Sequence, residues 1–302
     1  MSSKTGETTE GGLPAAGARA EAARAAAALA GLKHAVLRPE QAGVQLNLGD
    51  LWAYRELLYF LTWRDIKVRY KQTLMGVSWV VIQPLLTMLI FSLVFTRFVK
   101  LDEGAIPYPL FAYAGLLLWT FFSVSVTSGT HSLISNTSLV TKVYFPRAFI
   151  PAAAVGAGLV DLSVGAVPLL ALALYYRVNV TWGLLLLPVF LLLGAMLALS
   201  AGMIAAALTV RYRDLRHALP FLLQLWMFAS PVLYPVHLVP EHWRWAFVAN
   251  PMTGVLEGFR AALTGTGFDW SLVAVPAAAA PVLVCAAYYL FRRLEDTFAD
   301  VI

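Results

Sequence analysis

The sequence predicts an all-α polytopic membrane protein: six transmembrane helices, an N-terminal amphipathic interface helix, and re-entrant extracytoplasmic helices between spans five and six. Apolar residues make up 60% of the 302 residues and charged residues 13%, whereas charged residues form about a quarter of ordinary globular domains. The apolar residues form long blocks, several exceeding the ~20 residues that cross a bilayer as a helix. Strand-like alternation is absent, so helices are favoured over a β-barrel.

Composition divides the chain into four regions. Residues 1–50 are rich in Ala, Gly, Glu and Arg and lack the apolar core of a signal peptide, so we expect a disordered cytoplasmic extension. We expect the amphipathic interface helix at 51–76, the six-span transmembrane domain at 77–293 and a cytoplasmic tail at 294–302.

The interface helix combines aromatic and basic side chains at helical spacing. Its apolar stripe consists of Tyr59, Trp63, Ile66 and Tyr70. Cations occupy an adjacent face, namely Arg64, Lys67 and Lys71. This pattern predicts a helix lying in the membrane interface, with rings at headgroup depth and cations toward anionic lipid. The alternative is an ordinary surface helix of a soluble domain.

Six apolar blocks predict the spans. They cover residues 77–96, 108–128, 149–176, 182–210, 219–234 and 272–291. Lys and Arg are enriched in the loops on one side, which the positive-inside rule makes cytoplasmic. We therefore expect a multi-pass membrane protein with both termini in the cytoplasm.

A loop on the basic side, residues 136–147, has a capping residue, a short apolar and basic segment, and Pro146 as a stop signal. It predicts a short helix held between two spans, suited to contact a cytoplasmic partner, although a solvated loop fits the pattern equally well. At 211–216 three arginines surround Asp214, which favours a salt-bridged connector over a partner contact.

Asp161 is a carboxylate within an otherwise apolar span, where an unpaired charge is costly. One interpretation is a proton relay. A relay usually involves further ionisable residues at matching depth, and the neighbouring blocks contain none. A hydrogen-bonded structural carboxylate at a helix contact is therefore favoured.

Aromatic residues are dense in the second and fifth blocks. The candidates for a sugar-conducting channel are Trp119, Phe122, Trp226, Phe228 and Tyr234. Interfacial belts alone account for Tyr234. Trp119 and Trp226 lie deeper, where an indole N–H that faces lipid finds no acceptor, so a stacked sugar or channel water is the expected acceptor.

Residues 235–269 form the one sizeable external segment and predict two short helices dipping into the membrane edge. Glu257 and Arg260, at i and i+3, are expected to pair on one helix face. The segment is either a stacking or gating element or a packed extracellular cap, and its candidate gate residues are Trp243, Trp245, Glu257, Phe259 and Arg260.

Several motifs are absent from the sequence. It contains no GxxxxGK[ST] phosphate loop, no HExxH or similar metal motif and no Asp-rich cluster for Mg-diphosphate, which disfavours a membrane glycosyltransferase or phosphatase. The basic residues form no dense patch for nucleic acid. The lone Cys285 permits neither a disulfide framework nor a cysteine-based metal site.

Four stretches carry a family resemblance: WRDIKVRYKQTLMGVSWVVIQPLLTMLIFSLVF at 63–95, SNTSLVTKVYFPR at 135–147, NPMTGVLEGFR at 250–260 and FADVI at 298–302. From about residue 51 onward the chain resembles the type-2 ATP-binding-cassette permeases that export polysaccharides. Members that export O-antigen, capsule or teichoic acid share these motifs, and drug exporters generally do not. The extension at 1–49 is longer than usual for the family.

The resemblance implies a homodimer around a continuous channel, with two copies of a separate nucleotide-binding subunit that hold ATP and Mg²⁺. This chain is then a permease of the bacterial cytoplasmic (inner) membrane, without an enzymatic site or cofactor of its own. The implied cargo is a lipid-linked polysaccharide, with O-antigen favoured. Its phosphates would meet Arg64, Lys67, Arg69 and Lys71. The implied ATPase coupling residues are Asn136, Thr141, Lys142, Tyr144 and Arg147. The alternatives are export of a small or apolar molecule, or a membrane enzyme of lipid-linked glycan synthesis.

Overall fold

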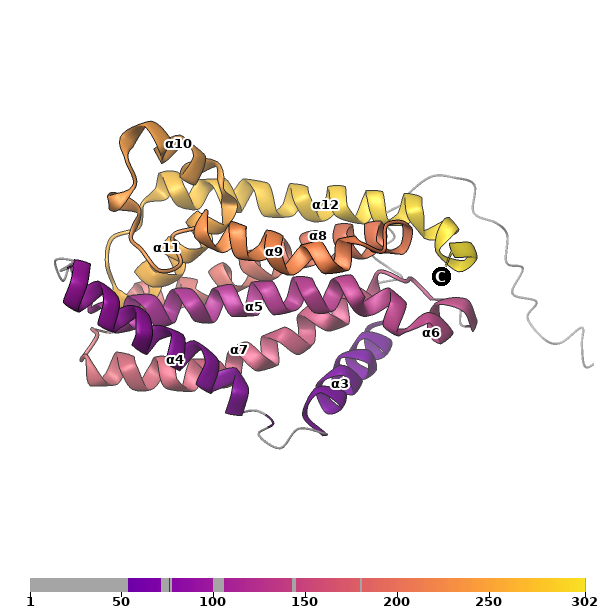
Figure 1. Ribbon diagram of the computed structural model, residues 1–302, viewed down its shortest axis with the longest axis horizontal. Helices are drawn as coiled ribbons and strands as arrows, with labels where there is room; N and C mark the ends of the chain where they lie inside the picture. The colour runs from indigo at the N-terminus through magenta and orange to yellow at the C-terminus, as the bar shows by residue number, and fades with distance from the viewer. Residues whose placement is uncertain are drawn as a thin grey trace, which may run out of the picture. The chain divides into compact units, whose positions relative to one another are not determined.

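The computed structural model describes residues 54–71, 76, 78–99, 106–142, 145–179 and 181–301 (Figure 1). Every extended regular element in these ranges is a helix, which confirms the helical fold class. The predicted N-terminal extension at 1–50 lies outside the described residues.

The helices follow one another along the chain with short connections. In order they are α3 (Arg55–Lys71), α4 (Ser78–Val94) with a π-helical end (Phe95–Val99), α5 (Tyr108–Ser135), α6 (Thr137–Lys142), α7 (Phe149–Tyr175), a 3-10 turn (Trp182–Leu186) leading into α8 (Leu187–Arg211), α9 (Leu215–Phe228), a 3-10 turn (Val236–Leu238), α10 (Glu241–Ala249), α11 (Pro251–Thr264) and α12 (Trp270–Val301).

Among the residues that the structure describes, five helices are long and apolar enough to cross a membrane. They are Ser78–Arg97, Tyr108–Ser135, Phe149–Tyr175, Trp182–Arg211 and Trp270–Glu295. The predicted fifth span corresponds to α9, whose 14 residues extend only about 21 Å at 1.5 Å per residue, against a hydrocarbon core of about 30 Å. The helix ends at Phe228, three residues before Pro231. The six-span count therefore stays a prediction.

The long helices pack around α5. Buried residues make up 78% of the most apolar stretch of α5 but only 11% of that of α4, which places α5 at the centre and α4 at the periphery. The main neighbours of α5 are α4, α7 and α8, and α9 and α11 also contact it. A Cβ atom on Gly129 of α5 would lie 3.4 Å from the Cα atom of Gly202 in α8, so glycine at both positions permits this close backbone approach.

The two ends of the helical bundle differ. Helices α10 and α11 lie at one end, whereas α6, the connection between α8 and α9 and the end of α12 lie at the other (Figure 1). The basic residues of α6, of the connection between α8 and α9 and of the end of α12 thus share one end of the bundle, whereas α3 lies along its side (Figure 1). The predicted pair of short helices between 235 and 269 is present as α10 and α11, while their insertion into the membrane edge stays a prediction.

The interface helix α3 packs against α7. Leu61 is its buried residue, whereas the rings of Tyr59 and Trp63 are 64% and 55% exposed, as a lipid-facing stripe requires. Tyr70, predicted on the same stripe, turns instead toward Asp161 of α7.

Candidate functional site

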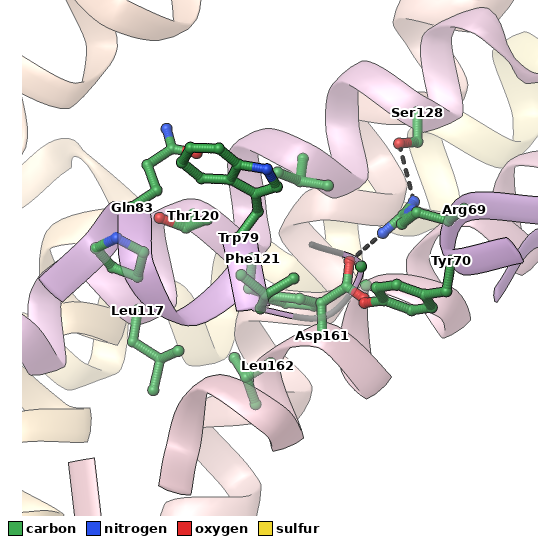
Figure 2. Close-up of a pocket in the computed structure, with 15 residues that line it drawn as sticks. Arg69, Tyr70, Trp79, Gln83, Leu117, Thr120, Phe121, Ser128, Asp161 and Leu162 are labelled. Carbon is green, nitrogen blue, oxygen red and sulfur yellow. Dashed lines mark hydrogen bonds and ion pairs between the residues drawn. The ribbon is translucent and has the colours of Figure 1, made fainter. Parts of the chain in front are cut away.

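A cavity of about 320 Å³ opens where α3 meets α4, α5 and α7 (Figure 2). Its wall is mainly apolar and includes Pro84 of α4, Leu117 and Phe121 of α5 and Leu162 of α7. Polar side chains gather at one end, where Arg69, Tyr70 and Ser128 surround Asp161 (Figure 2). The cavity thus combines a hydrocarbon-like wall with a single charged end.

Asp161 is held by two residues of the interface helix. The Arg69 guanidinium forms an ion pair with one carboxylate oxygen, and the Tyr70 hydroxyl donates a hydrogen bond to the other. Arg69 also donates from Nη2 to the Ser128 hydroxyl at 3.3 Å. The Asp161 side chain is only 12% exposed, so its charge needs these partners. The predicted hydrogen-bonded structural carboxylate is confirmed.

Tyr70 is a hydrogen-bond donor throughout the physiological pH range. Burial, reinforced by the bond to Asp161, raises the pKa of its hydroxyl above the usual value of about 10. The phenol therefore keeps its proton beside the carboxylate. Together, Arg69 and Tyr70 fix the end of α3 to the middle of α7.

The four predicted phosphate-binding cations have different surroundings. Arg64 pairs with Asp65 at 2.8 Å, and Arg69 pairs with Asp161. Lys67 and Lys71 are exposed, and no carboxylate lies within salt-bridge distance of either in the described part of the chain. These two lysines are therefore the cations of α3 with no competing carboxylate.

The deep aromatic residues form an internal cluster. The ring centroids of Trp119 and Phe122 in α5 lie 6.4 and 5.0 Å from that of Trp226 in α9. Trp119 and Phe122 are buried within this single chain. The Trp226 indole N–H donates to Asn250 Oδ1 at 3.2 Å. Its acceptor is therefore a side chain of the protein, whereas a sugar or a water molecule was expected.

The other two channel candidates lie outside this cluster. Phe228 presents a ring that is 53% exposed. The Tyr234 hydroxyl donates to the Phe228 carbonyl at 2.6 Å, which joins the end of α9 to the chain that follows it.

Arg260 of α11 is buried, with 2% exposure, and its guanidinium donates four hydrogen bonds. The acceptors and distances are Phe111 O (3.2 Å), Pro231 O (2.7 Å), Val232 O (2.6 Å) and Glu257 Oε1 (2.9 Å). The pair with Glu257 confirms the predicted i, i+3 contact. The guanidinium carbon also lies 3.6 Å from the centroid of the Phe111 ring.

These bonds support the non-helical chain after α9. Asn250 donates to Ala229 O at 3.3 Å and to Ser230 Oγ at 2.8 Å, and Tyr108 donates to Leu233 O at 2.8 Å. Buried carbonyls outside regular structure need such donors. Residues 229–235 can therefore remain non-helical among the helices.

Gly115 makes room for the Arg260 side chain. A Cβ atom built at Gly115 would collide with the Arg260 guanidinium and the Val232 carbonyl. No sequence pattern singles out this glycine, because the group that fills its space comes from a distant helix.

The predicted gate residues do not meet on one surface. Trp243 and Trp245 of α10 are 55% and 69% exposed, whereas Phe259 and Arg260 of α11 are 2% exposed. Glu257 is intermediate in exposure between these two pairs of residues. It borders a second cavity of about 230 Å³. Helix α11 is thus a packed support and α10 an exposed cap, while gating stays a prediction.

A family model for ABC-2 type transporters matches residues 56–264, which include the cavity, the aromatic cluster and the Arg260 contacts. The chain belongs to the ABC-2 type transporter family. This membership confirms the family resemblance drawn from the motifs.

The O-antigen export system permease protein RfbA of Myxococcus xanthus is a relative of this ABC-2 transporter chain. It is 34% identical over 84% of this chain and 98% of its own length. A Klebsiella pneumoniae protein of the same name is 26% identical over 86% of this chain and 98% of its own length. The polysialic acid transport protein KpsM of Escherichia coli is 24% identical over 66% of this chain and 78% of its own length.

In this ABC-2 transporter chain the predicted coupling segment contains the short helix α6. Val140 is buried against the bundle, whereas Thr141 and Lys142 are exposed. The Asn136 side chain donates to Ser132 O at 2.8 Å and so belongs to the end of α5. Tyr144 lies outside the described residues.

Arg147 ties the coupling segment to the last helix. Its backbone N–H donates to Glu295 Oε1 at 3.1 Å, and its guanidinium donates to the Glu295 carbonyl oxygen. Glu295 also pairs with Arg292 at 2.9 Å. Arg147 therefore anchors the segment to α12. The exposed residues of α6 are Ser138, Thr141 and Lys142.

Proposed function

We propose that this chain is the channel-forming transmembrane subunit of an ATP-driven exporter of lipid-linked polysaccharide from a bacterial cytoplasm. O-antigen is the favoured cargo. The observation that carries the proposal is the 34% identity to an O-antigen export permease over 98% of that protein's length. The KpsM capsule relative is less similar and covers less of both chains.

The proposed assembly is a homodimer with two copies of a cytoplasmic ATPase subunit that binds ATP and Mg²⁺. The basic end of the bundle faces the cytoplasm, with both termini there, in agreement with the positive-inside rule. Thr141 and Lys142 lie on the exposed face of α6 at that end and are the proposed ATPase contact. The opposite end, with α10 and α11, then forms the outer cap.

Substrate approaches the cytoplasmic interface in this proposal. Lys67 and Lys71 are exposed without a carboxylate partner in the described ranges, so they are available to lipid phosphates. Each such cation near anionic headgroups contributes about 1 kcal/mol of attraction. In this proposal the short helix α9 and the following residues 229–235 together form the fifth of six membrane crossings.

The experiment is to purify the chain with its ATPase partner and measure ATP hydrolysis in nanodiscs with and without lipid-linked polysaccharide. Glycolipid should stimulate hydrolysis, and cells that lack the chain should lose surface polymer on immunoblots. Stimulation by small apolar molecules but not by glycolipid would instead identify a small-molecule exporter. Incorporation of sugar into lipid without an ATPase would identify an enzyme.

A cysteine crosslinking experiment tests the coupling contact separately. Thr141→Cys should crosslink to a cysteine placed on the ATPase surface, with exposed Arg213→Cys as the comparison at the same end of the bundle. Crosslinks from residue 213 alone would move the docking site to the connection between α8 and α9.

A further inference from the structure

The cavity between α3, α4, α5 and α7 has a volume of about 320 Å³ that no side chain of the described residues fills. Its wall of Leu117, Phe121 and Leu162 offers water no hydrogen bonds, and empty apolar space forgoes dispersion contacts. A hydrocarbon chain would restore those contacts. The anchoring of α3 to Asp161 does not by itself require such a space.

The polar end of the cavity retains unused donors. A guanidinium has five N–H groups, of which Arg69 uses one for Asp161 and one for Ser128. Both Asp161 oxygens are already engaged, by Arg69 and Tyr70. The remaining donors, on a side chain that is 27% exposed, suit an acceptor with several oxygens, and phosphate binds guanidinium in this way.

The cavity lies between the basic helix α3 and three apolar candidate membrane spans. Helix α3 is basic and carries exposed rings, whereas α4, α5 and α7 are candidate membrane spans. Figure 2 shows Arg69, Tyr70 and Ser128 at one side of the cavity and Leu117 and Thr120 at the other. Trp79 and Gln83 of α4 are exposed where they border it, so the cavity is accessible from outside the chain.

We propose that this cavity binds a phosphate-headed lipid, with the phosphate at the free Arg69 N–H groups and part of one hydrocarbon chain along Leu117, Phe121 and Leu162. The proposal deepens the proposed function and rests on it for one point, that the lipid carrier of the exported polymer is a candidate ligand. Membrane phospholipid has the same chemistry, and the two sources are separated below.

Lipid binding to the purified complex with its ATPase is measured by native mass spectrometry, with undecaprenyl phosphate, phosphatidylglycerol and neutral polyprenol as probes. The Val124→Trp change fills the cavity from α5. The Arg69→Gln, Asp161→Asn double change removes both charges and keeps hydrogen-bonding groups. The matched control is Val167→Trp on α7, where the side chain is 65% exposed and borders no part of the cavity.

The wild-type complex should retain at least one phosphate-headed probe about tenfold better than polyprenol, a difference of about 1.4 kcal/mol. Val124→Trp should lower that retention about tenfold, and the double variant should reduce the phosphate preference to about twofold. Val167→Trp should match the wild type. Binding of undecaprenyl phosphate identifies the carrier as the ligand, and binding of phosphatidylglycerol alone identifies membrane phospholipid; either supports the site.

Equal retention by Val124→Trp and Val167→Trp, or no phosphate preference in the wild type, overturns the proposal. A photoreactive undecaprenyl phosphate on the wild-type complex keeps the test decisive where Val124→Trp fails to fold. Its crosslinks should map to the cavity-lining residues of α4, α5 and α7, and crosslinks confined to residues outside the cavity contradict the site. A complex that binds lipid here but whose ATPase ignores glycolipid overturns only the proposed function.

Discussion

Replacement of Arg260 by methionine should destabilise the protein and expose the chain after α9. The change removes four donated hydrogen bonds and leaves the carbonyls of Pro231 and Val232 without a donor among the described residues. Each buried unsatisfied acceptor costs about 1–3 kcal/mol, so two cost about 2–6 kcal/mol. The Phe111 carbonyl is less affected, because it lies within helix α5.

Glu257 also loses its partner, but its side chain is 28% exposed and water replaces part of that interaction. We therefore expect a loss of about 3–5 kcal/mol, in the range for breaking a buried ion pair and above most single substitutions. Arg260→Lys should have an intermediate effect, because an ammonium lacks the planar fork that reaches several carbonyls at once.

Two measurements test this expectation on protein purified in detergent. The first is the thermal midpoint by size-exclusion chromatography, which should fall by several degrees. The second is maleimide labelling of Leu233→Cys, which is 5% exposed in the wild type, in a background where the exposed Cys285 is replaced by alanine. Arg260→Met should make position 233 reactive. Equal midpoints and labelling in Arg260→Met and in the exposed-site control Arg244→Met would refute the reasoning.

Three further predictions use the same stability assay. Gly115→Ala should destabilise the protein because its Cβ collides with the Arg260 guanidinium, whereas Gly267→Ala, with open space around it, should not; equal midpoints would contradict the collision. Asp161→Asn should lower the free energy of unfolding by about 2–3 kcal/mol, because it leaves Arg69 without its anion. It should also loosen α3, which protease cleavage would detect. Asp65, the more exposed partner of Arg64, should tolerate the same change. Asp269 accepts hydrogen bonds from Ser271, and these bonds lower the pKa of its carboxyl in the folded protein. The ionised carboxyl therefore stabilises the fold above the usual pKa of about 3.9, and this stabilisation is lost as the pH falls through the folded-state pKa. Asp269→Asn should therefore make the thermal midpoint depend less on pH in the acid range.

Local patterns predicted the elements and contacts that a helix itself determines. The i, i+3 spacing of Glu257 and Arg260 gave their pairing, because helix geometry brings such residues together. The capping and stop signals around 136–147 fitted either a short helix or a solvated loop, and the structure has the helix α6 there. The apolar blocks gave the long helices, because burial in lipid or protein selects apolar side chains over many turns.

Contacts between distant segments were not predictable from such patterns. The partners of Asp161 lie 91 and 92 residues earlier in the chain, and no periodicity connects α3 to α7. The Trp226 indole N–H donates to Asn250, 24 residues later in the chain. From the sequence alone, a sugar or a water molecule was the expected acceptor. The predicted fifth span extended beyond the end of α9 because residues 230–233 are buried without being helical. An apolar run indicates burial and does not by itself indicate a helix.

The carbonyls after α9 also constrain how the protein is made. Tyr108 has been synthesised when this stretch leaves the ribosome, but Arg260 follows Pro231 and Val232 by 29 and 28 residues. Until α11 emerges, water or lipid headgroups must hydrogen-bond these two carbonyls. Residues 229–235 can therefore settle among the helices only after α11 has been made, so membrane insertion of this part of the chain is completed out of sequence order.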